Sequence, residues 1–433
     1  MPLERVSGIF DLLCLHAANA ERYPYLLETF GTQGWDILFA FPKDEVRYGI
    51  SEVPSGNFFS LLDRAWRDRP SLNKEGDVPF RGGWFIYLGY ELLHELETTV
   101  GLPKDTSDSF PLAVMTRIPA AIMCNKVRGE TYLFSEHAQH LAHLKADLAQ
   151  RQPFVSSHFA ISNLIEEDEA IYLHGIAQVK KYIRQGDVFQ VNLSREWQAE
   201  IHASNPALDL YASLRRNNPA AFGGLAQFGK HAIISSSPER LVKVTNALIE
   251  TRPIAGTYPR STIPIEDGRL RHELINNPKE RAEHIMLVDL ERNDLGRVAE
   301  PGTVKVKELM QVKTYAHVHH IESIIQAMKK ADITPLQILR AVFPGGTITG
   351  CPKVRTMQII NELEVNPRFA YTGSMGYLNL DGDMDFNILI RSFMLTSHKL
   401  KFRAGGGIVA DSDPQRELAE TRAKAKGLLQ SLA

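Results

Sequence analysis

Two pairs of glutamates are the first residues in this chain whose type and spacing could do chemistry. Glu280 and Glu283 stand ahead of an apolar run typical of a buried helix, and Glu417 and Glu420 fall on a second predicted helix. Residues three apart lie on one face of a helix, so each pair presents two carboxylates together. Mg²⁺ prefers such hard oxygen ligands and usually keeps several waters. We therefore expect a magnesium site in which some of the four glutamates bind through water.

Three consecutive glycines, Gly405 to Gly407, stand just before the second acidic pair. Without a Cβ, backbone N–H groups could form a nest that closely approaches a bound anion. Ser412 or Asp413 can cap the helix that follows, with Pro414 at its first position. This combination suits a substrate that bears its own carboxylate, bound beside a metal ion. A glycine-rich turn before a solvated helix is the alternative interpretation.

The elements that must position these residues are mostly strands. The stretch from Gly186 to Arg195 alternates as a strand does, and it places Gln190, Asn192 and Ser194 on one face that meets water or lines a cleft. Many strands with grouped rather than alternating helices predict an α+β fold. We expect an N-terminal region over residues 1–150 and a catalytic region over residues 165–433.

Composition narrows the classes of function. The chain has 433 residues and 49 basic against 51 acidic side chains, so nothing in its net charge of −2 favours binding to nucleic acid. No apolar run is long enough to span a bilayer, and the first residues lack a signal-peptide pattern. The three cysteines, Cys14, Cys124 and Cys351, show no metal-binding spacing. We therefore expect a reduced, cytoplasmic protein with no membrane or nucleic-acid partner.

From about residue 165 to its end the chain resembles the chorismate-utilising enzymes, a family that includes anthranilate, aminodeoxychorismate, isochorismate and salicylate synthases. The matching stretches follow the family order and contain Gln190, Glu239, Gly256, Thr257, Glu280, Glu283, His320, Thr347, Tyr377, Arg391, Gly405 to Gly407, Glu417, Glu420 and Lys424. The resemblance implies large packed antiparallel β-sheets with helices outside, to which both halves of the chain contribute strands.

The resemblance also implies roles for these residues. It gives Mg²⁺ the direct ligands Glu283 and Glu420, with Glu280 and Glu417 acting through water. The groups that hold the carboxylates of chorismate match Tyr377, Arg391, Lys424 and the amides of Gly405, Gly406 and Gly407. Glu239 matches the acid for the departing C4 hydroxyl, His320 a histidine close to the ring, and Gly256, Thr257 and Thr347 the walls of the site.

Gln190 bears on which nucleophile attacks the ring. Family members that add water carry a lysine base at this position, and a glutamine cannot deprotonate water. We therefore expect ammonia as the nucleophile and disfavour an isochorismate-type hydration. None of the three cysteines stands in the glycine-rich elbow that a glutaminase needs. The ammonia is then expected from a separate glutamine amidotransferase subunit.

The product depends on two conflicting signals. Ala255 is typical of anthranilate synthases, whereas many aminodeoxychorismate synthases carry a nucleophilic lysine there. The stretch from Gly34 to Pro42 and the run Asp385-Phe-Asn-Ile look more like the aminodeoxychorismate branch. We favour 4-amino-4-deoxychorismate as the product, with anthranilate plus pyruvate as the alternative. A regulatory paralogue without activity is a further alternative, which the full set of matches opposes.

The N-terminal part carries a possible effector element. Tyr25-Leu-Leu-Glu28-Thr29 resembles the stretch where tryptophan binds in component I proteins. The family usually completes that site with a Pro-Tyr-Met or Pro-Phe-Ser stretch, whereas Ala221-Phe222-Gly223 stands here. Because this match loses the proline and the polar or sulfur side chain, the sequence does not predict feedback by tryptophan.

Overall fold

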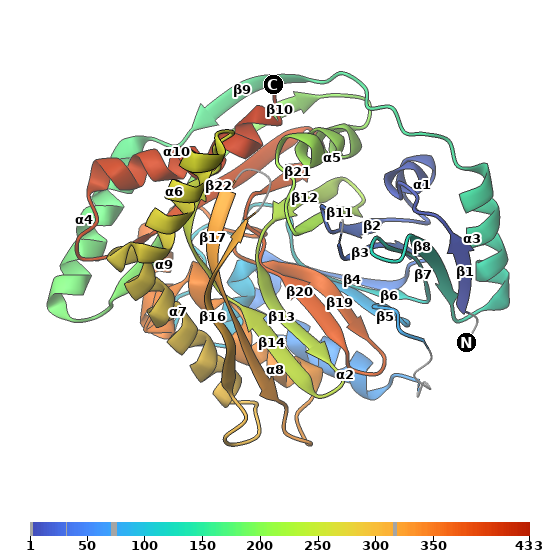
Figure 1. Ribbon diagram of the computed structural model, residues 1–433, viewed down its shortest axis with the longest axis horizontal. Helices are drawn as coiled ribbons and strands as arrows, with labels where there is room; N and C mark the ends of the chain where they lie inside the picture. The colour runs from blue at the N-terminus through green and yellow to red at the C-terminus, as the bar shows by residue number, and fades with distance from the viewer. Residues whose placement is uncertain (1–2, 32, 71–75, 315–317) are drawn as a thin grey trace.

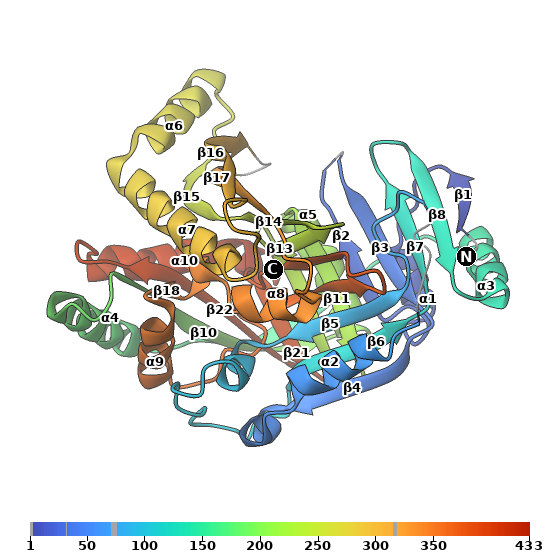
Figure 2. The same cartoon turned by 90° about the horizontal axis from the view of Figure 1, so that it is seen from below.

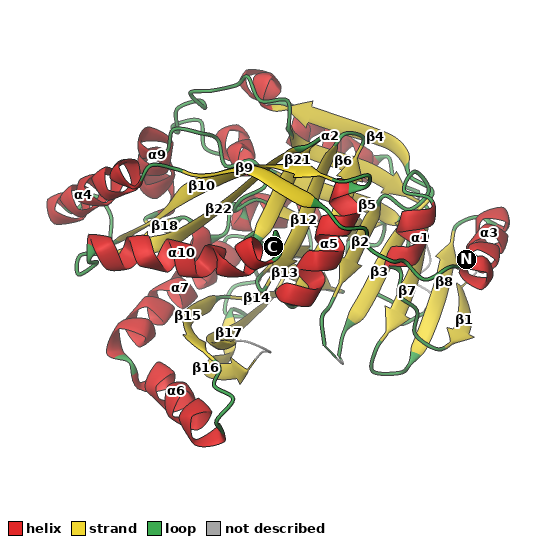
Figure 3. Ribbon diagram, turned by 90° about the horizontal axis from the view of Figure 1, so that it is seen from above, coloured by secondary structure: helices red, strands yellow, loops and turns green. Residues whose placement is uncertain are grey.

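The computed structural model describes residues 3–31, 33–70, 76–314 and 318–433, and this part of the chain forms two large antiparallel β-sheets with helices on the outside (Figures 1 and 3). The predicted α+β fold is thereby confirmed. Within the described residues no helix is both long and apolar enough to cross a membrane.

The larger sheet has 12 strands and contains the glycine run near one end. Its strands follow in spatial order as β1 (Leu3–Ser7), β8 (Glu130–Ser135), β7 (Ala120–Asn125), β3 (Trp35–Ala40), β2 (Tyr25–Glu28), β11 (Phe222–Phe228), β12 (His231–Ser237), β21 (Ser392–Thr396), β22 (Lys399–Ile408), β10 (Gln190–His202) and β18 (Gly350–Cys351), with β9 (Ala160–Glu166) paired to β10.

The second sheet has 10 strands and packs against the first. Its spatial order is β15 (Ile254–Pro259), β17 (Val318–Met328), β14 (Leu248–Arg252), β13 (Arg240–Thr245), β20 (Met384–Asn387), β19 (Ser374–Asn379), β5 (Gly83–Leu88), β6 (Pro111–Ile118) and β4 (Lys43–Gly49), with β16 (Lys305–Thr314) paired to β17.

The helices cover the outer faces of the sheets, as Figure 2 shows. They are α1 (Leu13–Ala18), α2 (Phe58–Arg67), α3 (Ala138–Gln150), α4 (Glu169–Gln185), α5 (Pro206–Asn217), α6 (Pro264–Asn276), α7 (Pro278–Gly296), α8 (Pro335–Val342), α9 (Lys353–Leu363) and α10 (Pro414–Gln430), with short 3₁₀ helices η1 (Ile50–Ser55), η2 (Tyr90–Glu95) and η3 (Gly346–Ile348).

The main core lies between the sheets and explains why the central strands are apolar on both faces. All six residues of β5 are buried, and Phe85 stacks on Tyr25 of the other sheet with ring centroids 4.0 Å apart. Smaller clusters fill the space under α3, α5 and α10 and under α4 and α9. Burial of this kind is the main driving force for such layers.

In each sheet a block of strands from the first predicted region joins a block from the second at one strand pair. β2 from the first region pairs with β11 from the second, and β5 from the first region pairs with β19 from the second. Helices α7 and α10, which carry the predicted glutamates, lie at one end of the molecule (Figure 1) and contact β15 and β22 respectively. The region where the predicted site residues surround these helices is called the cleft below.

Candidate active site

The glycine run is the inner wall of the candidate site. Gly405, Gly406 and Gly407 are extended residues of β22 and pair with Ser194, Leu193 and Asn192 of β10. The predicted nest is wrong, because a nest needs left-handed residues and none of the three glycines has a positive φ. The fold needs glycine here because of close approaches: a Cβ on Gly405 would lie 2.4 Å from the Leu193 carbonyl oxygen.

Gly406 faces the second acidic pair. A Cβ on Gly406 would lie 3.4 Å from Glu417 Oε2 and 3.6 Å from Glu420 Oε1, both on α10. Asp413 caps this helix by accepting from the Arg416 amide at 2.9 Å, with Pro414 in the first turn as predicted. The cap therefore directs the first turn of α10 and its carboxylates at the glycine strand.

Each carboxylate of α10 has a partner. The Ser412 hydroxyl donates to Glu417 Oε1 at 2.6 Å. Lys424 Nζ lies 2.8 Å from Glu420 Oε1 and donates to the Gly405 carbonyl at 3.0 Å. The charge of Lys424 lowers the pKa of Glu420. Burial alone would lower the pKa of Lys424, but the charge of Glu420 outweighs it, so the pKa of the lysine is raised. A single cation thus links the glycine strand to the acidic helix.

The first acidic pair approaches from α7, which Asn277 caps by accepting from the Lys279 amide. Gln190 Nε2 donates to Glu283 Oε1 at 2.9 Å, and Glu280 Oε2 lies 2.9 Å from the point where Gly256 would carry a Cβ. Burial raises the pKa of Glu280, and the charges of Glu283 and Glu420 raise it further. Burial also raises the pKa of Glu283, against the hydrogen bond from Gln190.

The structure therefore brings together acidic residues that are far apart in the sequence. Their negative charges repel one another, and a bound cation would reduce this repulsion. Their hard oxygen atoms fit Mg²⁺. Nevertheless, no three acidic, histidine or cysteine side chains of the described ranges already stand as a ready-made metal site. The magnesium ligands remain a prediction.

Glu239 stands between strands β12 and β13 and is buried. Its side chain is only 5% exposed, and its Oε1 has no hydrogen-bond partner within the described residues. Burial raises the pKa of Glu239 to about 7, although the Thr347 hydroxyl and the Ile254 backbone lower it. A carboxyl with this pKa is protonated in a large fraction of molecules at neutral pH and can donate a proton.

Arg391 supplies a positive charge beside Glu239. Burial lowers the pKa of the guanidinium, and the Glu239 charge opposes this effect. No hydrogen bond or ion pair of the Arg391 side chain is found among the described residues. This half-buried guanidinium is suited to bind the carboxylate of a ligand.

His320 and Thr257 face each other across neighbouring strands β17 and β15. His320 Nδ1 lies 3.0 Å from Thr257 Oγ1 and 3.2 Å from the Gly256 carbonyl oxygen. Because a carbonyl can only accept, the neutral ring carries its proton on Nδ1 and keeps Nε2 as a base. Burial and the charge of Arg391 lower the pKa of His320 to about 4, so the ring is neutral at physiological pH.

Tyr377, a predicted substrate-binding residue, lies among a different set of side chains. It lines a separate cavity of about 350 Å³ together with Glu28, Arg240, Phe222 and Asp385. This cavity holds both the Leu-Leu-Glu element and the Ala221-Phe222-Gly223 stretch. The strand β19 carries its side chains alternately on two faces, and the sequence pattern could not tell which face meets the cleft.

Tyr371, which the sequence analysis missed, lies closer to the cleft. It is 5% exposed. Burial raises the pKa of Tyr371, and the nearby charges of Arg368 and Lys424 oppose that rise. It stands six positions before Tyr377, so the only signal in the sequence was a second tyrosine in the same glycine-containing stretch.

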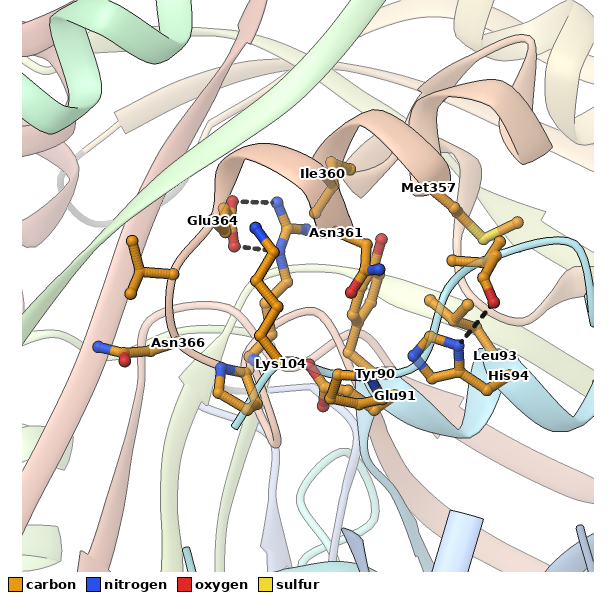
Figure 4. Close-up of a pocket in the computed structure, with 15 residues that line it drawn as sticks. Tyr90, Glu91, Leu93, His94, Lys104, Met357, Ile360, Asn361, Glu364 and Asn366 are labelled. Atoms are coloured by element: carbon orange, nitrogen blue, oxygen red, sulfur yellow. Dashed lines mark hydrogen bonds and ion pairs between the residues drawn. The ribbon is translucent and has the colours of Figure 1, made fainter. Parts of the chain in front are cut away.

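A buried ionic cluster around Glu364, also missed, lies behind the glycine strand. Glu364 accepts from the Ser194 amide at 2.9 Å, from Arg368 at 2.6 Å and from Arg403 at 3.0 Å. Figure 4 shows Glu364 among the residues of a neighbouring pocket that also contains Tyr90 and Glu91. Burial opposes ionisation of Glu364, but the two arginines outweigh it and hold its pKa low. Because Arg368 also donates to the Asn192 carbonyl at 2.7 Å, the cluster fixes β10 and β22 behind the glycine wall.

Comparison with known proteins identifies the family of this chain. The chorismate binding enzyme family matches residues 23–430. An anthranilate synthase component I-like protein of Synechocystis sp. is 40% identical over 359 residues, which cover 82% of this chain and 73% of that protein. Anthranilate synthase component 1 of the same organism is 37% identical over 447 residues, covering 94% and 86%.

A solved structure agrees as well. The crystal structure of anthranilate synthase component I from Streptococcus pneumoniae TIGR4 has 30% sequence identity and a TM-score of 0.79, and the match covers 91% of this chain and 92% of that one. With a family match over nearly the whole length and relatives this similar, the chain belongs to the family of chorismate-binding enzymes.

Proposed function

We propose that this protein aminates chorismate with ammonia and releases anthranilate and pyruvate. The observation that carries the proposal is the similarity, over most of both chains, to proteins named anthranilate synthase component 1. Ala255 supports it, since it is 6% exposed beside Gly256 and offers no amine to the cleft. This choice reverses the preference that the sequence signatures gave.

The signatures for aminodeoxychorismate lie together in the fold. Gly34, Trp35 and Asp385 all line the separate cavity of Tyr377 and Glu28. We give them less weight than the similarity to proteins named anthranilate synthase component 1. They still favour 4-amino-4-deoxychorismate as the second candidate product.

The cleft residues suit the chemistry of amination. Ammonia attacks C2 of the ring while the C4 hydroxyl leaves as water with the proton of Glu239. Gln190 is neutral and bonded to Glu283, so it cannot act as the base that hydration would require. His320 Nε2 can then accept a proton from the ring. Loss of this proton, together with departure of the pyruvate group, makes the ring of the product aromatic.

Binding would rest on charge. Arg391, Lys424 and the backbone of β22 would hold the carboxylates of chorismate, with Tyr371 beside them. We propose Mg²⁺ as the cofactor, held directly by Glu283 and Glu420 and through water by Glu280 and Glu417. When bound, the metal would neutralise a substrate carboxylate and stabilise charge that develops as the side group departs.

The nitrogen donor would be a separate glutamine amidotransferase subunit. Cys14 and Cys124 are buried, and burial raises the pKa of all three cysteine thiols, so none is activated as a nucleophile. The purified chain is therefore expected to use ammonium salts and not glutamine.

The decisive assay supplies chorismate, Mg²⁺ and ammonium to the purified chain and follows the product by fluorescence and mass. Anthranilate should appear directly, together with an equal amount of pyruvate. If 4-aminobenzoate forms only after a lyase is added and no pyruvate is released before, aminodeoxychorismate is the product and the proposal fails. Turnover without ammonium would instead indicate hydration.

A further inference from the structure

Asn192 is a polar residue beside the cleft to which the proposed chemistry gives no role. It follows Gln190 by two positions on β10, so both side chains lie on one face of the strand. Gly407 of β22 is directly opposite Asn192, and a Cβ on Gly407 would lie 1.9 Å from Gln190 Nε2. The amide group of Gln190 therefore lies over Gly407, beside the side chain of Asn192.

The hydrogen-bond partners of the two amides decide which way each amide group faces. Gln190 Nε2 donates to Glu283 Oε1 at 2.9 Å, and Asn192 Nδ2 donates to the Thr347 carbonyl oxygen at 3.5 Å. An ionised carboxylate and a carbonyl accept hydrogen bonds and cannot donate them, so the nitrogen of each amide faces its protein partner. The oxygen of each amide consequently faces away from that partner.

Both amide oxygens, Gln190 Oε1 and Asn192 Oδ1, are buried acceptors that no donor of the described residues reaches. Buried polar atoms in folded proteins nearly always have a hydrogen-bond partner, so an acceptor without one indicates a bound water or ligand. Here two such oxygens lie on one face of one strand. They point to a small ligand that donates two hydrogen bonds.

The backbone around these two residues is held on both edges of the strand. The Asn192 amide donates to the Thr349 carbonyl at 2.8 Å, and Gln190 pairs with Cys351 of β18. Along its other edge β10 pairs with β22. Sites built on a firmly paired strand are positioned more precisely than sites on loops. The two oxygens are therefore held in place before a ligand arrives.

We propose that Asn192 Oδ1, together with Gln190 Oε1, binds the ammonia that attacks chorismate. The inference rests on the proposed function, in which ammonia is the nucleophile. Ammonia has three N–H groups and one lone pair, so two N–H groups can donate to the two oxygens while the lone pair stays free to attack C2. A water molecule held by the same oxygens would still need a base to become a nucleophile, and neither amide is a base.

The bond changes are those of the amination itself. The lone pair of the nitrogen forms the bond to C2, the ring double bonds shift, and the C4–O bond breaks as the hydroxyl takes the proton of Glu239 and leaves as water. The nitrogen then bears a positive charge and gives one proton to solvent water. Because the two amide oxygens carry partial negative charge, they stabilise this charge while it develops on the nitrogen.

The test separates the two substrates by steady-state kinetics. Asn192→Leu removes the acceptor with little change of volume, whereas Asn192→Asp keeps an oxygen at the same place. Gln198→Leu is the matched control, because it makes the same change from amide to leucine at an exposed position of the same strand. We expect Asn192→Leu to raise the KM for ammonia about tenfold or more and to keep the KM for chorismate within about threefold. Asn192→Asp should raise the KM for ammonia less, and the control should change neither value.

Consumption of chorismate is followed, so the result does not depend on which product forms. Urea unfolding of each variant reports whether the fold persists, and Asn192→Ala replaces Asn192→Leu if the leucine prevents folding. The inference is overturned by an unchanged KM for ammonia, by an equal rise of both KM values, or by equal effects of Asn192→Leu and Asn192→Asp. A rise only in the Mg²⁺ concentration needed for half activity also overturns it, since the oxygens would then serve the metal. A wild type that gains no chorismate consumption from ammonium instead contradicts the proposed function itself.

Discussion

At the scale of single residues, Glu239 has the environment of a general acid. Glu239→Gln removes the proton while keeping the shape, and we expect the maximal rate with ammonium to fall by roughly 10²–10⁴-fold. In the wild type, the rate at a fixed concentration of free ammonia should decline as pH rises through about 7, because Glu239 ionises there. The pH profile of kcat checks this.

The same pKa has a consequence for stability. In the folded protein Glu239 holds its proton up to about pH 7, whereas the unfolded chain releases it near 4.5. The contribution of this group to the free energy of unfolding therefore falls as pH rises from about 4.5 to about 7, by about 3 kcal/mol in total. Glu239→Gln should flatten this part of the stability profile in urea unfolding. An unchanged slope would contradict the burial argument.

Single residues also show the limits of prediction from sequence. Spacing singled out the two pairs of glutamates, whereas His320, Arg391 and Lys424 came only from the family resemblance, and the roles of all of them remain predictions. Tyr377 and Tyr371 could not be distinguished, because both stand in one apolar stretch and the sequence does not show that β19 begins between them, at Ser374. The Glu364 cluster escaped notice because its members come from distant parts of the sequence and contact one another only in the fold.

At the scale of elements, the glycine strand β22 permits a matched pair of substitutions. Gly405→Ala would bring a Cβ to 2.4 Å from the Leu193 carbonyl oxygen, a backbone atom that cannot move freely. We expect it to lower the free energy of unfolding by roughly 1–3 kcal/mol. Gly406→Ala has its nearest neighbour at 3.4 Å and should keep the stability.

Of these two variants, Gly406→Ala should have the larger effect on activity. The Cβ of Gly406→Ala would point at Glu417 and Glu420, where we place substrate and metal, so the KM for chorismate should rise at least tenfold. Urea unfolding and steady-state kinetics on both variants provide the measurements. Equal losses of stability in the two variants would show that strand pairing, and not the cleft, is the reason for glycine at both positions.

Helix α7 carries the test of the metal. Glu283→Gln keeps the hydrogen bond with Gln190 possible but removes a negative charge, so we expect the rate to fall by at least about 10²-fold while the fold persists. Excess chelator should abolish the activity of the wild type, and added Mg²⁺ should restore it. Glu273→Gln on α6, at an exposed ion pair with Arg269, is the control, and it should change neither the rate nor the dependence on Mg²⁺. Full activity in chelator would exclude a metal requirement.

Element boundaries were predictable where local chemistry decides them. The cap at Asp413 and the proline after it are local signals, and the structure places α10 there. The conformation of Gly405 to Gly407 was not predictable, since glycine tolerates both a nest and a strand, and pairing with β10 decides between them.

At the scale of the whole molecule, the two regions should be unable to fold separately. A fragment of residues 165–433 would leave β11 without β2 and β19 without β5, and would expose two open strand edges. We expect this fragment to lack cooperative unfolding when expressed alone, as followed by circular dichroism. Coexpression with residues 1–150 should restore chorismate-dependent activity, whereas a fragment that unfolds cooperatively by itself would contradict the expectation.

The pairing of β5 with β19 also constrains how the protein is made on the ribosome. β5 is synthesised early and is buried on both faces in the finished protein, but its neighbour β19 leaves the ribosome only near the end of synthesis. Throughout translation the apolar edge of β5 has only β6 beside it, a state that favours aggregation. Slow elongation prolongs this exposure, and chaperones that bind nascent chains reduce the aggregation that it causes. Soluble yield should therefore depend on growth temperature and chaperone supply more than on the stability of the final fold.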